Sequence, residues 1–503
     1  MRGKASLGCA ILCGIAALAL PGIAGADIGI PGPTYVAGTS GPPTTSKPES
    51  KLWFNDGIWW ASMFHPGSDN YEIFRLDTGT QTWSVTGSQA IDTRNSTRQD
   101  IRWDGTHLWV ASHKFDSTPV FDGTPDPQGG DDMRLSRFSY DTLTGTYTRD
   151  FTVDIEDDQR AESLVIDQAQ DGKIWATWVQ QTAAGGPYRV LYSRTNGDCS
   201  TAAQCVFTNR APVPTSDPVS ADDISSLIRF DANNIGIMWS DQIASAFRFV
   251  VVDPAGSFGA IANASSGPSL ADDHINLKAF EGKVYAATKT KFDSKTQLNP
   301  QTRLLVRSAA GVWTAHTISF SPDQRTRPIV LLDTDNRVIH VFETGPHPSG
   351  PNPDIGGSIF ESTSDMDTID FAVLSRRPVI QDDSSAGMNN ATSTKDNVTG
   401  TTDVPVLASN DLTRRYWHHF EDLQDLPPPP TNDCTISGTS GSNIITGTNG
   451  RDVICAGAGN DIVRGRGGND VIRGGPGNDV LVGGTGSDRL VGQAGRDRLL
   501  GAA

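Results

Sequence analysis

Cysteine is scarce in this chain, which has only 6 cysteines among its 503 residues. Two of them fall in an apolar run near the N-terminus, and the other four form two close pairs, Cys199 with Cys205 and Cys434 with Cys455. No histidine lies near either pair, which argues against a zinc site and against a catalytic thiol. Even numbers of cysteines in an exported chain favour disulfides. The alternative, that Cys434 and Cys455 are unpaired, stays open.

Basic residues are outnumbered, because 41 Lys and Arg face 58 Asp and Glu, for a formal net charge of −17. The sequence has no Lys- or Arg-rich cluster of the kind that binds phosphate backbones or anionic membranes. We therefore expect no nucleic-acid partner.

Long apolar runs are also missing, with one exception at the N-terminus. Residues 7–23 are mostly apolar, follow a short basic start and end in Ala24-Gly25-Ala26. This pattern predicts a secretory signal peptide over residues 1–26, cleaved before Asp27. A membrane anchor is the alternative, but the run is short for a span and no later segment is apolar enough for one. We therefore expect a secreted, extracellular protein with no transmembrane segment in the mature chain.

Composition divides the rest of the chain into four segments. Residues 27–50 are rich in Gly, Pro, Thr and Ser and suit a flexible, exposed leader or one loose strand. Residues 422–433 contain the proline run Pro427–Pro430, which favours a stiff, extended linker. These segments delimit a large domain over residues 51–421 and a small C-terminal domain over residues 434–503.

Apolar residues at helical spacing are absent from the large domain, which shows short β-rich runs between Asp, Gly, Asn and Pro. The runs recur as a unit with a first strand, a tight turn and a second strand rich in Trp, Tyr and Ala. The units are Leu52–Ala61, Ile101–Ala111, Leu164–Ala176, Leu227–Trp239, Leu277–Ala286, Ile329–Val341 and a degenerate one near Val398–Trp417. Such repetition predicts an all-β fold with a six- or seven-bladed β-propeller; a large β-sandwich is the alternative.

One turn of the large domain has a more specific pattern. The segment Arg75–Thr82 reads Arg-Leu-Asp-Thr-Gly-Thr-Gln-Thr. It resembles the Asp-box turn of sialidase-like (BNR) β-propellers, with Arg75 in place of the serine of that motif. The resemblance implies a turn that stabilises a blade and that has no catalytic role.

From Gly438 onward the small domain follows a nonapeptide register, Gly-Gly-x-Gly-x-Asp-x-aliphatic-x, in seven copies. The sixth position is Asn443 in the first copy and then Asp452, Asp461, Asp470, Asp479, Asp488 and Asp497. The eighth position is always aliphatic: Ile445, Ile454, Val463, Ile472, Leu481, Leu490 and Leu499. A glycine-rich linker is the alternative, but a linker would not keep an acid and an aliphatic residue in register.

These repeats resemble the RTX, or hemolysin-type, calcium-binding nonapeptide family over the whole tail. The resemblance implies a parallel β-roll in which two repeats make one coil and Ca²⁺ lies between turns two repeats apart. The paired acids are then Asp452 with Asp470, Asp461 with Asp479, Asp470 with Asp488, and Asp479 with Asp497. The turn glycines of the expected sites are Gly450, Gly459, Gly468, Gly477 and Gly486. The sequence departs from the pattern at Asn443, which removes a charge from the site shared with Asp461, and at Ala456, Arg466 and Gln493, which replace glycines.

Each residue type in the repeat has a physical reason. Glycine reaches left-handed backbone conformations and lets carbonyl oxygens point inward, and carboxylates are hard oxygen ligands that suit Ca²⁺. The tail has no Phe, Trp or Tyr, so its apolar core is thin for a domain of this size. We therefore expect Ca²⁺ to act as a folding ligand, because the free energy of metal binding becomes free energy of folding.

The starts of the predicted innermost strands are repeatedly charged, and in a propeller they surround the mouth of the central channel. They carry Arg98, Asp100, Arg160, Glu162, Asp222, Asp223, Asp272, Asp273, His274, Arg325, Arg327, Lys395 and Asp396. Such a ring suits a sugar acid, a pair of catalytic carboxylates or a metal. The alternative is ion pairing that joins adjacent blades.

Two functions stay open for the large domain. In the first, the propeller binds an extracellular carbohydrate, such as a polysaccharide, while the tail provides calcium-dependent stability. In the second, the protein is a secreted glycoside hydrolase or polysaccharide lyase with its acids and His274 at the channel mouth. A deep pocket with Asp273, His274 and an arginine without a carboxylate partner favours the enzyme, whereas full pairing of these residues removes its support. The sequence identifies no catalytic residue.

Overall fold

The computed structural model describes residues 27–35, 43–44, 47–94, 96–121, 130–157, 159–208, 210–231, 234–347, 357–371, 377–400, 402–421, 423, 434–450, 452–468, 470–486 and 488–501. The predicted signal peptide at residues 1–26 and the predicted linker at residues 422–433, except Leu423, lie outside these residues. Within the described ranges, no helix is long and apolar enough to cross a membrane.

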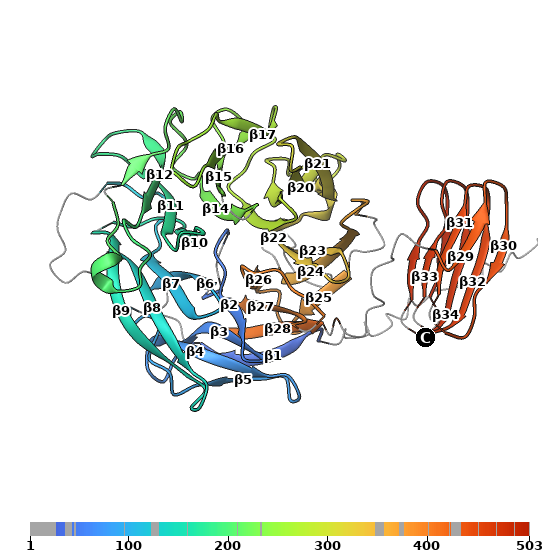
Figure 1. Ribbon diagram of the computed structural model, residues 1–503, viewed down its shortest axis with the longest axis horizontal. Helices are drawn as coiled ribbons and strands as arrows, with labels where there is room; N and C mark the ends of the chain where they lie inside the picture. Colours follow the sequence, from blue (N-terminus) through green and yellow to red (C-terminus); the bar gives the residue numbers. More distant parts are fainter. Residues whose placement is uncertain are drawn as a thin grey trace, which may run out of the picture.

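The large domain is a seven-bladed β-propeller (Figure 1). Each blade is a four-stranded antiparallel sheet, and six of the seven blades use four strands that follow one another in the chain. The prediction of an all-β propeller is confirmed, and the number of blades is seven rather than six.

The first three blades come from the N-terminal half of the domain. Blade 1 contains β2 (Leu52–Asn55), β3 (Ile58–His65), β4 (Asn70–Asp77) and β5 (Thr82–Val85). Blade 2 contains β6 (Thr97–Trp103), β7 (His107–Lys114), β8 (Met133–Asp141) and β9 (Thr146–Glu156). Blade 3 contains β10 (Val165–Gln168), β11 (Ile174–Gln181), β12 (Tyr188–Arg194) and β13 (Ala211–Pro212), with the short 3-10 helix η1 (Ala202–Gln204) before its last strand.

The remaining blades follow in chain order. Blade 4 contains β14 (Ser225–Phe230), β15 (Asn234–Asp241), β16 (Ala246–Val252) and β17 (Ala262–Ser266). Blade 5 contains β18 (Ile275–Phe280), β19 (Lys283–Lys289), β20 (Pro300–Arg307) and β21 (Trp313–Phe320), followed by η2 (Ser321–Asp323). Blade 6 contains β22 (Thr326–Asp333), β23 (Val338–Pro346), β24 (Gly357–Asp365) and β25 (Arg377–Gln381). Blade 7 contains β26 (Met388–Thr392), β27 (Val404–Asn410), β28 (Arg415–Glu421) and β1 (Ile30–Thr34).

The N-terminal strand closes the ring. β1 pairs antiparallel with β28, with Ile30 opposite His418 and Thr34 opposite Arg415. This corrects the expected boundary at residue 51, because a strand from the 27–50 leader is part of blade 7. It also corrects the seventh repeat unit, since Val398–Trp417 covers β27 and the first three residues of β28 rather than the first two strands of the blade. The innermost strand β26 escaped detection because its sequence, Met-Asn-Asn-Ala-Thr, lacks the apolar pattern of the other units.

Tight turns join the strands within a blade. The β2–β3 turn, Asp56-Gly57, has φ values of 55° and 72°, and this backbone matches the right-handed twist of the flanking strands. The Asp-box-like segment forms the turn between β4 and β5, where the Asp77 carboxylate accepts the Thr80 N–H at 3.0 Å. Asp77 therefore stabilises a blade turn, as the resemblance implies.

Large aromatic side chains fill the space between adjacent blades. Trp53 and Trp60 of blade 1 are fully buried and lie edge-on to the Tyr147 ring of blade 2, with centroids 5.7 and 5.2 Å away. The Trp53 indole N–H donates to the Tyr147 hydroxyl at 2.8 Å. Their polar atoms are thus satisfied while their rings are removed from water, which stabilises the contact between the blades.

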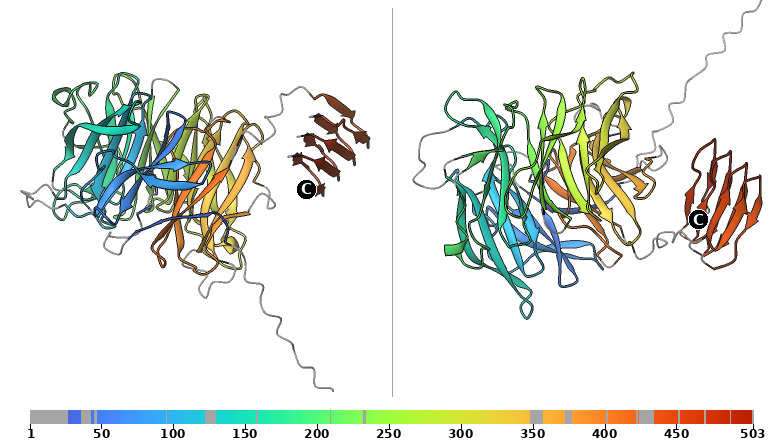
Figure 2. Two further views of the ribbon diagram at one scale, coloured as in Figure 1. Left: turned by 90° about the horizontal axis from the view of Figure 1, so that it is seen from below. Right: turned by 45° about the horizontal axis from the view of Figure 1, so that its top comes forward.

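The small domain is a parallel β-roll made of two facing sheets (Figure 2). One sheet contains β29 (Ile436–Thr439), β31 (Val453–Gly457), β33 (Val471–Arg473) and β35 (Arg489–Val491). The other contains β30 (Ile444–Thr446), β32 (Ile462–Gly467), β34 (Val480–Thr485) and β36 (Arg498–Leu500). Paired strands are two repeats apart, as in Ile454 opposite Ile472, so one coil takes two nonapeptides as expected.

A thin aliphatic core holds the two sheets together. The eighth-position side chains form one cluster, in which Ile454, Val463, Ile472 and Leu481 are fully buried. The disulfides favoured by the cysteine spacing are both formed, Cys199–Cys205 in the propeller and Cys434–Cys455 at the first coils of the roll. An ion pair of 2.8 Å between Arg489 Nη2 and Asp365 Oδ2 joins the roll to blade 6.

Candidate functional sites

Glycine is required at the turns of the roll because the coils approach one another closely there. Gly459, Gly468, Gly477 and Gly486 have φ values of 115°, 97°, 151° and 122°, a left-handed backbone that side chains disfavour. A Cβ atom on Gly477 would also overlap the carbonyl oxygen of Gly459 in the preceding coil. Arg466 and Gln493 keep the left-handed backbone, with φ values of 82° and 69°, so these two departures leave the register intact.

The aspartates stack in two columns along the edges of the roll. The Oδ1 atoms of Asp470, Asp479, Asp488 and Asp497 accept the backbone N–H of the aspartate two repeats earlier, at 2.8 to 2.9 Å. All four predicted pairs are therefore direct neighbours. Because each Oδ1 accepts a backbone N–H, these contacts hold neighbouring aspartates together without a metal.

The second carboxylate oxygen of these residues, Oδ2, differs from Oδ1 in its hydrogen bonding. The Oδ2 atoms of Asp461, Asp479 and Asp488 are buried and have no hydrogen-bond partner among the described residues. The Oδ2 atoms of Asp479 and Asp488 lie beside Gly474 and Gly483, where a Cβ would overlap them. Burial raises the pKa of Asp479, and the charges of Asp461 and Asp497 add to this effect. The turns thus hold anionic oxygens that lack a donor, in a space that only glycine leaves open, and this geometry fits a cation.

The first coil differs from the others. Asn443 uses its Oδ1 to accept the Thr439 N–H at 2.7 Å, and its own N–H donates to Asp461 Oδ1 at 2.6 Å. Asp452 Oδ2 accepts the Thr448 hydroxyl at 3.0 Å. Thr439 and Thr448 stand at the second position of their repeats, where three of the five later repeats have glycine, and sequence reasoning missed their role. In this coil the protein supplies donors that the later coils lack.

Comparison with protein families agrees with this geometry. The model of the RTX calcium-binding nonapeptide repeat (4 copies) matches residues 437–472 and 473–503. The C-terminal region consists of RTX calcium-binding repeats. A comparison with curated proteins finds no match to the chain.

Solved structures resemble the chain at low identity. An ulvan lyase of polysaccharide lyase family 25 is 11% identical, with a TM-score of 0.47, over 79% of this chain and 94% of that one. The periplasmic gluconolactonase of Pseudomonas aeruginosa is 13% identical, with a TM-score of 0.45, over 75% of this chain and 95% of that one. A protein of unknown function from Dyadobacter fermentans is 11% identical, with a TM-score of 0.40, over 64% and 92%. These similarities concern the fold alone.

Most charged residues predicted at the channel mouth are joined to a neighbour. The ion pairs are Lys395–Asp100, Arg102–Asp396, Arg160–Asp131 and Lys289–Asp272. Asp223 Oδ2 accepts the Ser220 N–H at 2.7 Å, and the Arg325 guanidinium stacks on the Phe360 ring. Ion pairing, which the sequence left open as the alternative, therefore accounts for much of the ring.

The segment that follows β26 in blade 7 forms hydrogen bonds with other blades. The Ser393 carbonyl accepts the Lys51 N–H at 3.1 Å, and the Thr394 carbonyl accepts Lys278 Nζ at 2.8 Å. Asn397 Nδ2 donates to the Ala279 carbonyl at 2.9 Å. These contacts join blade 7 to blades 1 and 5. Burial lowers the pKa of Lys278 to about 7.

A smaller set of mouth residues has incomplete pairing. Asp273 contacts Lys47 and His274, whereas Arg327 has a buried Nε without a hydrogen-bond partner among the described residues. Arg327 also has a left-handed backbone, with φ of 53°, which is strained for this residue. The criterion for an enzyme is thus met only in part, and the enzyme hypothesis stays a prediction. Sequence reasoning missed Lys47, because it belongs to the segment assigned to the leader.

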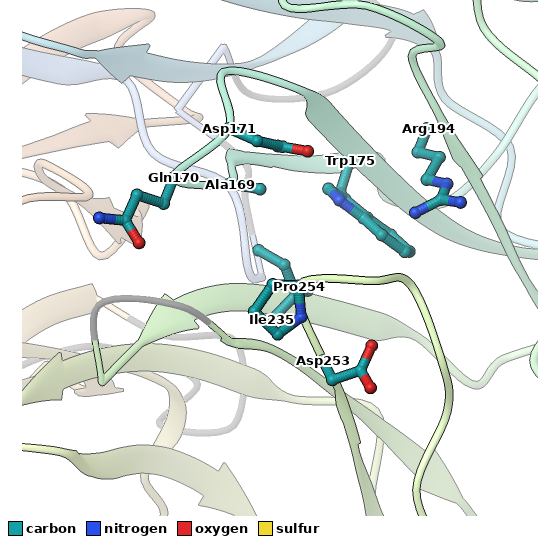
Figure 3. A pocket seen from close by; sticks show the side chains of 8 residues that line it. All are labelled: Ala169, Gln170, Asp171, Trp175, Arg194, Ile235, Asp253 and Pro254. Carbon is teal, nitrogen blue, oxygen red and sulfur yellow. The ribbon is translucent and has the colours of Figure 1, made fainter.

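A cavity of about 240 Å³ lies between blades 3 and 4, away from the channel mouth (Figure 3). Trp175 and Ile235 form apolar walls, and Gln170, Asp171 and Asp253 supply polar groups. The Arg194 guanidinium lies over the Trp175 ring, 5.1 Å from its centroid. An aromatic wall with a few polar groups is a common composition for a small-ligand site.

Proposed function

We propose that the roll binds Ca²⁺ between its turns and that the bound ions complete the folding of this domain. The buried Oδ2 atoms of Asp461, Asp479 and Asp488, which lack a hydrogen-bond donor, carry the proposal. A buried carboxylate oxygen without a partner destabilises the fold. A hard cation removes that penalty and suits oxygen ligands in flexible geometry.

The ligands come from both columns of aspartates and from the turns. The carboxylates are those of Asp452, Asp461, Asp470, Asp479, Asp488 and Asp497, and the backbone ligands are the carbonyls of Gly450, Gly459, Gly468, Gly477 and Gly486. The later coils bind most tightly, because Asn443 and Thr448 already satisfy part of the first coil through protein hydrogen bonds.

We place the protein outside the cytoplasm. The predicted signal peptide and the two disulfides support export, since disulfides persist in oxidising compartments. Extracellular Ca²⁺ sites typically have dissociation constants of about 10⁻⁴ to 10⁻³ M. Ca²⁺ concentrations above that range are enough to occupy the sites of the roll.

Calorimetric titration of the full-length protein with Ca²⁺ tests the proposal. We expect several sites in the unmodified chain and fewer in an Asp479→Ala variant, because Asp479 belongs to two predicted pairs. Asp217→Ala, an exposed propeller residue, is the matched control and leaves the titration unchanged. Equal heats and stoichiometry in the unmodified chain and Asp479→Ala would contradict the assignment.

For the propeller we propose a carbohydrate ligand in the cavity beside Trp175. The supporting observation is the combination of an aromatic wall with exposed Gln170 and Asp171 at its edge. A binding screen of neutral and acidic polysaccharides, with the Gln170→Ala/Asp171→Ala double variant, tests it. Loss of binding in that variant supports the cavity, and unchanged binding rejects it. Cleavage of a polysaccharide in the same screen would favour the hydrolase or lyase alternative.

A further inference from the structure

Three blades bring metal-ligating side chains together at the channel mouth. Glu162 comes from the start of blade 3, Asp222 from blade 4, and Asp273 with His274 from blade 5. One potential ligand atom each from Glu162, Asp222 and Asp273 lies within 4.8 Å of the others, and the same holds for Asp272, Asp273 and His274. Asp273 belongs to both groups, so carboxylates and an imidazole surround it.

Two of these side chains are deeply buried and carry unsatisfied atoms. Glu162 is 8% exposed and His274 is 6% exposed. Glu162 Oε2 and His274 Nε2 have no hydrogen-bond partner among the described residues. His274 Nδ1 lies 2.7 Å from Asp273 Oδ1. Buried polar atoms without partners are uncommon in folded proteins, and a bound ion is one of the few explanations for them.

The cluster also has more negative than positive charge within it. Lys47 Nζ lies 2.7 Å from Glu162 Oε1 and also contacts Asp273, so one ammonium serves two buried carboxylates with Asp222 beside them.

We propose that the channel mouth is a divalent-cation site, separate from the roll and centred on Asp273, the carboxylate shared by the group with Asp272 and His274 and the group with Glu162 and Asp222. Asp222 is exposed and gives the ion a route from solvent. Lys47 holds the carboxylates together when the ion is absent and competes with it for them.

The ligand types distinguish this site from the roll. The roll offers only oxygen, from carboxylates and carbonyls, which selects hard cations such as Ca²⁺. The mouth adds an imidazole nitrogen, which suits Zn²⁺, Co²⁺ or Mn²⁺ better than Ca²⁺. A titration with Zn²⁺ or Co²⁺ in saturating Ca²⁺ therefore reports on the mouth alone.

The experiment uses the full-length protein in millimolar Ca²⁺, titrated with Zn²⁺ by calorimetry and with Co²⁺ by visible absorption. We expect one tight site in the unmodified chain and a loss of affinity of about 100-fold or more in His274→Ala and Glu162→Gln. His65→Ala, a histidine on the rim of blade 1 bonded to Ser68, is the matched control and leaves the titration unchanged. Tryptophan fluorescence confirms that each variant is folded.

The Lys47→Met variant separates a metal site from a purely structural ion cluster. Removing the competing ammonium should tighten Zn²⁺ binding roughly tenfold, because like charges disfavour one another. Zn²⁺ should then also restore the melting temperature that this variant loses in EDTA. Absence of a Zn²⁺ or Co²⁺ site in the unmodified chain overturns the proposal, and so does unchanged or weaker binding in Lys47→Met. Neither result bears on Ca²⁺ binding by the roll.

Discussion

Buried carboxylates occur in both domains, but their partners differ. In the propeller, Asp100 is fully buried and contacts the Lys395 ammonium, and Glu361 is fully buried and contacts Arg377 at 2.7 Å. In the roll, the Oδ2 atoms of Asp461 and Asp479 lack a hydrogen-bond donor within the described part of the chain. A Lys or Arg side chain belongs to the protein and is always available to pair with a carboxylate, whereas a metal ion must bind from solution. The propeller should therefore be stable by itself and the roll conditional on calcium.

The arginines of the roll show the same difference. The tail contains about as many arginines as aspartates, yet Arg489 contacts Asp365 of the propeller. The side chain at this position extends from a strand, while the aspartates lie at the turns. Net charge is thus a poor guide to pairing, because Arg489 forms its ion pair outside the roll.

Calcium removal should have the largest effect on the difference in stability between the two domains. In EDTA we expect the roll to unfold and the propeller to stay folded, because four paired sites add roughly 6 kcal/mol at a tenfold excess of Ca²⁺ over its dissociation constant. Scanning calorimetry should lose one transition and keep the other. All 11 tryptophans lie in the propeller, so tryptophan fluorescence reports on that domain alone. A change in that fluorescence on adding EDTA that persists in His274→Ala, which lacks the proposed mouth site, would show that the domains are not independent.

The two disulfides give the next largest effect. Replacing Cys434 and Cys455 by serine should destabilise the roll by about 3 kcal/mol, because the bond closes a loop of 21 residues. The same change at Cys199 and Cys205, which are 6 residues apart, should destabilise the propeller by about 2 kcal/mol. We expect only the first variant to need more Ca²⁺ for folding, measured as the midpoint of a far-UV circular dichroism titration. Equal Ca²⁺ midpoints for the two variants would contradict this division.

The contribution of one buried propeller carboxylate, Asp223, to the pH dependence of stability should have the opposite sign to that of the roll. Burial raises the pKa of Asp223 in the propeller to about 6, although hydrogen bonds from Ser240 and Ser220 lower it. Since the folded pKa exceeds the unfolded one, stability from this group is present below about pH 4 and is lost as the pH rises through 6. Acid should instead weaken the roll, because its Ca²⁺ ligands must be ionised.

Asp223→Asn isolates this effect, because asparagine cannot ionise. At pH 7.5 it should stabilise the propeller by roughly 2 kcal/mol, which is the gain from the pKa shift less the poorer hydrogen bonding of an amide. The gain should shrink toward pH 4, and urea unfolding followed by tryptophan fluorescence measures it. Asp217→Asn, an exposed neighbour, is the control. A gain that does not vary with pH would assign the effect to packing rather than to ionisation.

The parts that the sequence predicts are those that depend on local spacing. Within the roll, each position of the nonapeptide has one role, so the stacked aliphatic core and the Asp pairs follow from the register of residues such as Ile472 and Asp470. The propeller follows from repeated hairpins in the same way. The closure of blade 7 by β1, the contacts of the segment around Lys395 with other blades and the contact of Lys47 with Asp273 join distant parts of the chain. No local pattern records them, and they become visible only in the folded structure.

The smallest effect concerns the one repeat that lacks an acid. Asn443 stacks on Asp461 as an aspartate would, with its N–H 2.6 Å from Asp461 Oδ1, but its amide carries no charge. Asn443→Asp should add a carboxylate to the first coil and stabilise the roll by about 1 kcal/mol at a tenfold excess of Ca²⁺ over the dissociation constant. In EDTA the same change should instead destabilise the roll, because the new charge stands beside Asp461 without a cation. Thermal melting with and without Ca²⁺ measures both signs, and Ser442→Asp, one position outside the column, is the control. A stabilisation that is equal in EDTA would mean that the sixth position acts through hydrogen bonds alone, and the difference between the two domains would then lie in packing rather than in the source of their cations.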